Sequence, residues 1–291
     1  MIVRFYFVVA LVLTHTLASA QKKEKVFTIH TSFGDMVAIL YNETPQHKAN
    51  FTKLVNQHYY DSLLFHRVIG GFMIQGGDPD SKRAKPGQAL GEGGPNYTVE
   101  AEFVPKYFHK KGVLAAARLS DAQNPTKASS GSQFYIVQGT ILTTDAANEL
   151  KFDQPKLNQA LQQYLAKPEH QLLRDSLAKL YTSGDMYHFK EKIFSLAPAI
   201  EKETGTKFTK DVPEERMKAY TTVGGTPHLD GSYTVFGELI SGLDVLDKIA
   251  AVKKDGNDRP VEDVRMFISV KELSKKKIEK MYGYHFPIVK K

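Results

Sequence analysis

Short runs of alternating hydrophobic and polar residues recur along the chain and predict a protein built mainly from β-strands. The first two runs form KVFTIHTSFGDMVAILY, which reverses at Gly34-Asp35, as in a β-hairpin. Further strand-like runs occur in LFHRVIGGFMIQGGD, GVLAAAR and GSQFYIVQG, and again in YTVFGELI and VRMFISVKEL. Many short strands separated by turn residues indicate a closed or nearly closed antiparallel barrel.

Two segments between these strands have helical periodicity instead. TPQHKANFTKLVNQHYY begins with Thr44 as a candidate N-cap and Pro45 at the first helical position, and Ala49 and Phe51 start an apolar stripe. GLDVLDKIA is the second segment. Together with the strands, they predict a mostly β fold with two associated helices.

Residues 141–225 interrupt the strand pattern and show no alternation. Apolar residues recur there at helical spacing and form three stripes, Leu157/Leu161/Tyr164/Leu165, Leu173/Leu177/Leu180/Tyr181 and Phe189/Ile193/Phe194. Apolar stripes indicate packing rather than disorder. The sequence therefore predicts a helical insertion, residues 141–225, within a β-domain formed by residues 21–140 and 226–273.

The first twenty residues have the layout of a cleavable secretory signal. Arg4 precedes an apolar run over residues 5–13, and the segment ends in Ala-Ser-Ala at Ala20. The run is shorter than the about 20 residues that span a bilayer comfortably. We therefore expect cleavage after Ala20, export, and no stable membrane insertion of the mature chain, with an uncleaved N-terminal anchor as the alternative.

Composition adds two constraints. The 291-residue chain is 42% hydrophobic and 24% charged, as expected for a globular protein with a core, and it has no cysteine, so an exported form would be held by packing alone. The net charge is +7, and six lysines fall within residues 274–291. Because aromatic residues accompany them only in MYGYHF, we interpret this segment as a solvated basic tail rather than a nucleic-acid or membrane-binding patch.

The stretch FHRVIGGFMIQGGD places a cation and an amide in an otherwise apolar pair of strands. Alternation puts Met73 and Gln75 on one face, and Arg67 joins them if the Gly70-Gly71 kink preserves the phase. No lysine and hydroxyl residue follow the glycines, as a phosphate loop would require. Histidines at metal-binding spacing and a nucleophile beside a base are also lacking in the sequence. We interpret His66 as a hydrogen-bonded structural residue.

Three motifs in this order, FHRVIGGFMIQGGD, GSQFYIV and HLDGSYTVFGELISGLDVLDKI, resemble the cyclophilins, the family of peptidyl-prolyl cis-trans isomerases. The resemblance covers residues 25–139 and 225–273. It implies an eight-stranded antiparallel β-barrel capped by two helices, acting on proline-containing polypeptides without a cofactor, a metal or nucleic acid. It assigns Arg67 and Gln75 as catalytic residues and places the substrate-binding positions at Phe72, Met73, Ala117, Gln133, Phe134, Leu229 and Tyr233.

The resemblance also suggests what each residue does. Arg67 would donate a hydrogen bond to the prolyl nitrogen, and Gln75 with backbone near Ala117 would hold the neighbouring peptide groups. A socket for the proline ring would come from Phe72, Met73, Phe134 and Leu229, although strict alternation sends Phe72 to the face opposite Met73. Gln133 has an alternative role as the brace of a loop.

Three positions differ from the pattern common in animal cyclophilins. His228 stands where many members have tryptophan, Tyr233 where many have histidine, and Arg118 where asparagine is common. These residues are similar to those of bacterial cyclophilins, so we expect a periplasmic enzyme that acts on exported proteins. The alternative function is a client-binding chaperone module in which the insertion is the main binding element. The sequence leaves the oligomeric state open.

Overall fold

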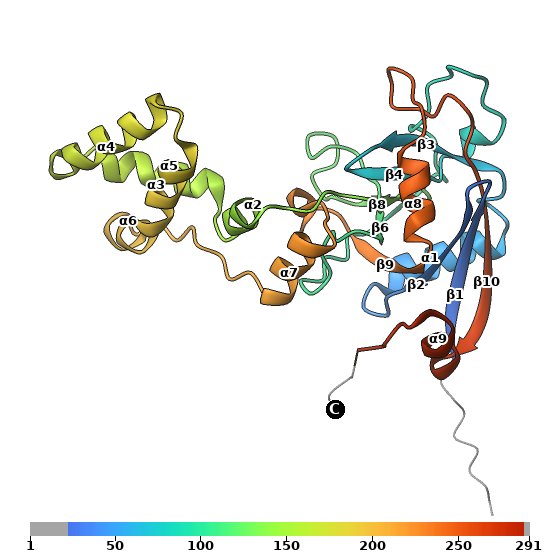
Figure 1. Cartoon of the computed structure of the whole chain (residues 1–291). Coiled ribbons are helices and arrows are strands. Elements are labelled where there is room, and N and C mark those ends of the chain that lie inside the picture. Colours follow the sequence, from blue (N-terminus) through green and yellow to red (C-terminus); the bar gives the residue numbers. More distant parts are fainter. Residues whose placement is uncertain (1–22, 288–291) are drawn as a thin grey trace, which may run out of the picture.

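The computed structural model describes residues 23–287, and its centre is a closed barrel of eight antiparallel strands in the order β1-β10-β3-β4-β8-β6-β9-β2 (Figure 1). A separate two-stranded ladder joins β5 (Thr98–Val99) to β7 (Ser129–Ser130). The predicted barrel is confirmed. Its strands are β1 (Lys23–Thr31), β2 (Gly34–Leu40), β3 (Leu63–Ile69), β4 (Met73–Gly76), β6 (Val113–Ala116), β8 (Phe134–Val137), β9 (Val235–Ser241) and β10 (Arg265–Ser274).

Two helices pack their apolar faces into the barrel core. They are α1 (Pro45–Asn56) and α8 (Leu243–Ala250), and the side chains of Phe51 and Leu246 lie in the same buried cluster as the inward residues of the strands. Thr44 precedes α1, as expected, but its side chain does not cap the helix. The carboxylate of Glu102 accepts hydrogen bonds from the first backbone amides instead, those of Gln46 and His47, each at 3.0 Å.

The C-terminal segment corrects one expectation. It forms helix α9 (Lys275–Tyr282) rather than a solvated tail, and the side chain of Ile278 is fully buried against Val26, Val37 and Ile39 on the outer face of β1 and β2. This covering helix also explains why β1 is buried on both faces and lacks clear alternation. The lysines of α9 lie on its other side. The lysine-rich composition of the segment therefore gave no indication that one of its sides packs against the barrel.

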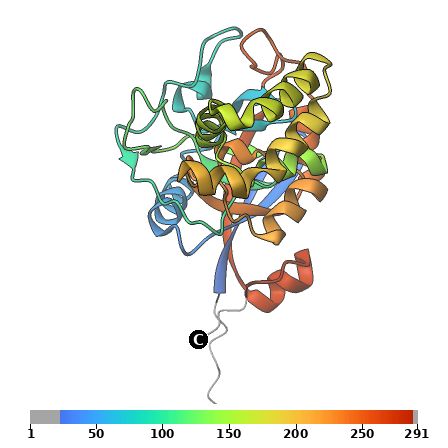
Figure 2. The ribbon, with the colours of Figure 1, turned by 90° about the vertical axis from the view of Figure 1, so that its left-hand side faces the viewer.

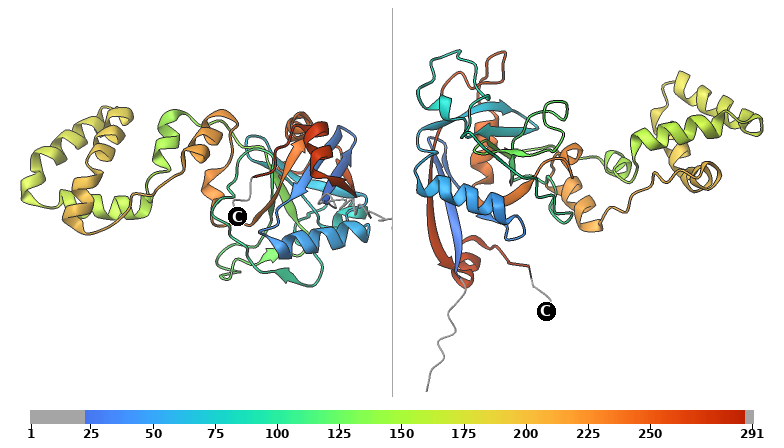
Figure 3. Two further views of the ribbon diagram at one scale, coloured as in Figure 1. Left: turned by 90° about the horizontal axis from the view of Figure 1, so that it is seen from below. Right: turned by 180° about the vertical axis from the view of Figure 1, so that it is seen from behind.

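Between β8 and β9 the described chain forms six α-helices. The middle four in sequence order form a four-helix bundle, which has a core of its own around Leu157, Tyr164, Ile193 and Phe208. In Figures 1 and 3 this four-helix bundle stands away from the barrel, and α2 and α7 lie between the two; Figure 2 shows the bundle in front of the barrel. The helices are α2 (Thr144–Glu149), α3 (Gln154–Leu165), α4 (Gln171–Thr182), α5 (Met186–Ser195), α6 (Ala197–Thr204) and α7 (Glu214–Thr222).

The remaining helical turns are short 3₁₀ segments, η1 (Pro79–Arg83), η2 (Pro168–His170) and η3 (Pro227–Leu229). None of the helices within residues 23–287 has the length and apolar character needed to cross a bilayer. The expected secretory signal, residues 1–20, lies outside the described residues, and the predicted domain bounds stay predictions.

Candidate active site

A β-bulge at His66 decides which side of the barrel Arg67 occupies. Phe65 pairs with Gly76 and Arg67 pairs with Gln75, so β3 has one residue more than β4 between these two pairs. Without the extra residue, Phe65 and Arg67 would share a face. The bulge therefore leaves Phe65 in the barrel core and turns Arg67 to the outer face.

The pairing across the next strands assembles that outer face. Ile69 lies opposite Met73, and Gln75 lies opposite Tyr135 of β8. Directly opposed residues of an antiparallel pair project to the same side of the sheet. The predicted common face of Arg67, Met73 and Gln75 is therefore present, and it extends to Tyr135.

The guanidinium of Arg67 is available to a ligand. The residue is half-buried, and its side chain makes no hydrogen bond or ion pair with another residue between positions 23 and 287. Arg118 behaves differently, since its Nε atom donates to the carbonyl of Ser232 at 2.8 Å and its guanidinium lies 4.4 Å from the ring centre of Tyr233. Arg118 thus holds the loop that carries Tyr233, whereas Arg67 is left free of such a structural contact.

An apolar cluster on the outer side of the barrel collects most of the expected socket. Met73, Ala117 and Leu229 are buried members, and Phe72 and Tyr233 are partly buried against them. Phe72 lies in the turn before β4, outside strand alternation, and its ring stacks on His228 with centres 5.5 Å apart. The position of Phe72 beside Met73 therefore agrees with the resemblance and not with strict alternation.

Phe134 is a correction, because it lies inside the barrel. It is 1% exposed and packs against Phe51 and Tyr60, with ring centres 5.4 and 5.6 Å away. It pairs with Gly76, the neighbour of Gln75, and so faces the core. Tyr135, which was not among the residues expected from the sequence, takes the place on the outer face. Two adjacent aromatic residues in a strand point to opposite sides of the sheet. Only the pairing with β4 shows which of the two faces the core.

Gln133 braces a loop, as the alternative interpretation held. Its Nε2 atom donates to the carbonyls of Gly91 and Gly93 at 2.8 and 2.7 Å, and its Oε1 atom accepts from Nε2 of Gln75 at 3.0 Å. Gln133 thereby orients the Gln75 amide. The backbone amide of Ala117 donates to the Gln133 carbonyl at 3.0 Å and its carbonyl accepts from Ser130 at 2.8 Å, so Ala117 offers the site chiefly its methyl group.

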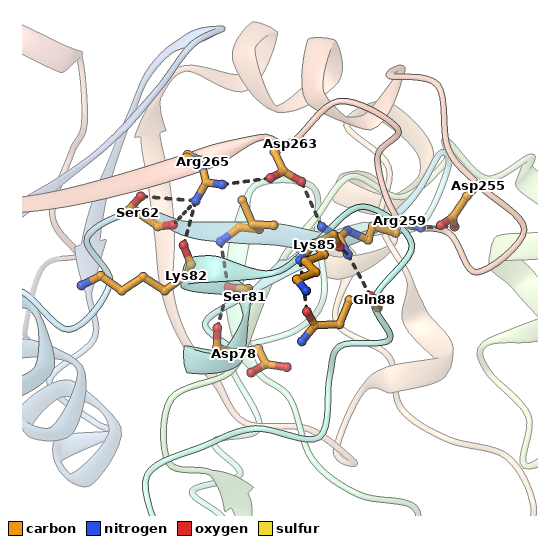
Figure 4. Close-up of polar contacts among 11 residues, drawn as sticks. Ser62, Asp78, Ser81, Lys82, Lys85, Gln88, Asp255, Arg259, Asp263 and Arg265 are labelled. Carbon is orange, nitrogen blue, oxygen red and sulfur yellow. Dashed lines mark hydrogen bonds and ion pairs between the residues drawn. The ribbon is translucent and has the colours of Figure 1, made fainter.

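Two arginines hold in place the glycine-rich loop between η1 and β5, residues 84–97, which contains Gly91 and Gly93 (Figure 4). Arg259 donates to the carbonyls of Lys85 and Gln88 at 2.9 and 2.8 Å and contacts Asp263 at 3.1 Å. Arg265 donates to the other oxygen of Asp263 at 2.9 Å. The shared carboxylate ties the loop after η1 to the start of β10, which fixes the loop that Gln133 braces.

His66 lies beneath this loop and is not hydrogen-bonded, contrary to expectation. Its side chain is buried, and neither ring nitrogen has a partner among the described residues. Burial lowers its pKa from 6.5 to about 4, although the nearby Asp78 carboxylate opposes part of this shift. The neutral imidazole is therefore the form that the fold accommodates.

The buried His66 predicts a loss of stability in mild acid. The unfolded chain binds a proton below pH 6.5 and the folded chain only below about 4, so the free energy of unfolding should fall as the pH falls through this window. From about pH 7 to about pH 5, His66→Leu should reduce this fall by about 2 kcal/mol, measured by urea denaturation. The matched change at an exposed position, His285→Leu, should leave the fall unchanged. An equal pH dependence in wild type and His66→Leu would contradict the assignment.

A buried polar network connects the apolar cluster to the helical insertion. Asp230, next to Leu229, accepts from the backbone amide of His109 at 2.8 Å and from the hydroxyl of Tyr220 in α7 at 2.7 Å. The Nε2 atom of His109 lies 3.0 Å from the hydroxyl of Tyr135. These residues are far apart in the sequence, and α7 thus helps to hold the loop that presents Leu229.

One group outside this site could ligate a cation. Glu169, His170 and Glu203 bring three potential ligand atoms within 4.8 Å of one another, at η2 and α6 in the bundle. Lys167 pairs with Glu203 at 2.7 Å, and His170 pairs with the same oxygen at 3.0 Å. These two contacts account for the geometry without a metal.

The chain is similar to several known proteins. The model of the family "Cyclophilin type peptidyl-prolyl cis-trans isomerase/CLD" matches residues 26–159 and 199–270 and leaves out part of the four-helix bundle. A crystal structure of a cyclophilin-type isomerase from Cryptosporidium parvum has a TM-score of 0.49 and 19% sequence identity to this chain, covering 86% of it and 98% of the other chain.

Bacterial relatives are more similar in sequence. A Staphylococcus saprophyticus protein named as a peptidyl-prolyl cis-trans isomerase is 31% identical over 237 residues, which are 81% of this chain and 86% of that protein. A Streptococcus pyogenes protein named as a bifunctional phosphatase/peptidyl-prolyl cis-trans isomerase is 31% identical over 240 residues, but the match spans 36% of its length. With the family match over most of its length, the chain belongs to the cyclophilin-type peptidyl-prolyl cis-trans isomerases.

Proposed function

We propose that Arg67 accelerates rotation about X-Pro bonds by donating a hydrogen bond to the prolyl nitrogen while the apolar cluster holds the proline ring. Partial double bonding of the C–N bond gives a barrier of about 20 kcal/mol. Rotation makes and breaks no covalent bond, so no nucleophile is required. In the twisted state the nitrogen becomes pyramidal and gains a lone pair, and a hydrogen bond to it opposes the return of resonance.

The observation that carries this proposal is the state of Arg67. Its guanidinium keeps its charge, presents donors in a fixed fork, and has no competing partner among residues 23–287. Its cross-strand neighbour Gln75 is oriented by Gln133 and can hold an adjacent peptide group. The site is therefore preorganised around one unpaired cation.

The apolar cluster beside Arg67 supplies binding rather than chemistry. Met73 and Leu229, with Phe72 at the edge, offer a surface on which a proline ring is removed from water. A short X-Pro peptide should therefore bind about tenfold more tightly than the same peptide with alanine in place of proline. Isothermal titration of both peptides measures this difference, and equal affinities would exclude the cluster as the proline socket.

We further propose that the substrates are exported proteins, because residues 1–20 have the pattern of a secretory signal. Arg4, the apolar run and the Ala-Ser-Ala ending support export, and the absence of cysteine is compatible with it. Sequencing the N-terminus of the protein purified from its own cells tests this point. If the protein is exported, the purified chain should begin at Gln21. A cytoplasmic chain that retains Met1 would contradict the proposed export.

A further inference from the structure

A cavity of about 800 Å³ lies between the barrel domain and the two helices next to it, α2 and α7. Its barrel side includes Tyr107, Tyr233 and Val235. Its insertion side includes Leu150 at the end of α2 and Val212 in the segment before α7, both half-buried. The cavity therefore has apolar residues on its barrel side and on its insertion side, contributed by different parts of the fold.

The cavity adjoins the proposed proline socket at two residues. Tyr233 lines the cavity and also packs in the cluster that contains Met73 and Leu229. His228 lines the cavity as well, and its ring stacks on Phe72. The two sites therefore lie side by side at Tyr233 and His228, so the residues that flank a proline on the socket would lie next to the cavity.

The insertion wall is fixed to the barrel domain before any ligand arrives. The Tyr220 hydroxyl of α7 donates to the carboxylate of Asp230 in the barrel domain at 2.7 Å. Arg216 of α7 donates to the carbonyl of Pro105 and lies 5.0 Å from the ring centre of Phe108. A preformed wall of this kind loses little conformational entropy when it binds a partner.

The chemistry of the lining suits a stretch of unfolded polypeptide. The apolar walls accommodate a hydrophobic side chain, whereas the charged residues of the cavity, Glu149, Lys210 and Asp211 among them, carry both signs and select for neither. A second cavity of about 590 Å³ shares Glu149 with the first and continues along α5 to Tyr187, which is 56% exposed. The surface thus extends well beyond the length of a single X-Pro dipeptide.

We infer that this cavity binds the segment of an unfolded polypeptide that flanks the isomerised proline, with a hydrophobic side chain of that segment between Leu150 and Val212. The inference rests on the proposed isomerase function and extends its substrate class from short proline peptides to unfolded chains. It gives the insertion a role in substrate binding that serves the isomerase, rather than a separate chaperone function.

The test compares two substrates on the same variants. One is a tetrapeptide with a single X-Pro bond, too short to reach the cavity, and the other is an unfolded reporter protein whose refolding is limited by one prolyl isomerisation. The variants are the double change Leu150→Ser/Val212→Ser and the single change Val212→Ser. The single change removes no buried helix residue. Both variants should lower kcat/KM for the reporter by about tenfold, mainly by raising KM. The tetrapeptide reaction should stay within about twofold and shows that each variant is folded.

Leu172→Ser is the matched control, because Leu172 is 85% exposed on α4 and lines neither cavity. It should leave both reactions unchanged. Equal effects of the Val212 change on the two substrates, no effect on either, or the same effect from Leu172→Ser would overturn the inference. So would a change in sedimentation without a change in KM, since the cavity would then be a contact between copies of the chain. A wild-type protein inactive on the tetrapeptide would instead refute the proposed function.

Discussion

Replacing Arg67 by alanine should lower kcat/KM for a short X-Pro peptide by about 100- to 1,000-fold, because a preorganised donor in a partly desolvated site contributes about 3–4 kcal/mol to transition-state stabilisation. The dissociation constant of the peptide should change far less, since the planar ground-state amide has little lone-pair density on nitrogen for Arg67 to bind. A protease-coupled assay gives the rate, and titration calorimetry gives the affinity.

Two further variants separate the hydrogen-bond geometry of Arg67 from its charge. Arg67→Lys keeps the positive charge but loses the fixed fork of donors, so its rate should lie between those of wild type and Arg67→Ala. Arg83, exposed in η1, provides the matched control, and Arg83→Ala should retain the full rate. If Arg67→Ala and Arg83→Ala turned over the peptide equally well, Arg67 would have no catalytic role.

The change Phe134→Ala should lower the free energy of unfolding by about 3–5 kcal/mol, as expected when a large aromatic side chain is removed from a close-packed core. Phe134 contacts aromatic rings of α1, β3 and the α1–β3 connection, through Phe51, Phe65 and Tyr60. Urea denaturation at neutral pH measures the loss, with an unchanged slope against urea concentration as the sign of two-state unfolding.

The same variant also distinguishes the core position from the socket position that the sequence suggested. At a temperature where Phe134→Ala is folded, its kcat/KM for a short peptide should stay close to that of wild type. Phe134→Leu, which fills most of the space, should be much less destabilised. A variant with nearly wild-type stability but a severe loss of peptide turnover would place Phe134 in the substrate site and refute the core assignment.

The sequence predicted the barrel strands and the common face of Arg67, Met73 and Gln75, because local alternation indicates both. The side of the barrel on which this face lies depends on the β-bulge at His66, which no local pattern indicates. Each strand shows its period within a few residues, and the Gly70-Gly71 turn preserves the phase between Ile69 and Met73. The same local information could not place Phe134 and Tyr135. That choice depends on the register with β4, which lies about 60 residues earlier in the chain.

Other features of the site depend on contacts that no local pattern contains. His109, Asp230 and Tyr220 form one network, but they come from a loop, a turn after η3 and a helix of the insertion. Helix α9 was difficult to predict for a different reason, because lysines dominate its composition. Only Ile278, with Tyr282 four residues later, indicated an apolar side. In both cases the structure adds tertiary packing to a segment whose residue types were already visible.

The most direct test of the proposed mechanism is the structure of the protein bound to a short X-Pro peptide. The proline ring should lie against Met73 and Leu229, with a guanidinium nitrogen of Arg67 about 3 Å from the prolyl nitrogen. A proline bound elsewhere, or an Arg67 side chain turned away to pair with a carboxylate of the protein, would contradict the mechanism.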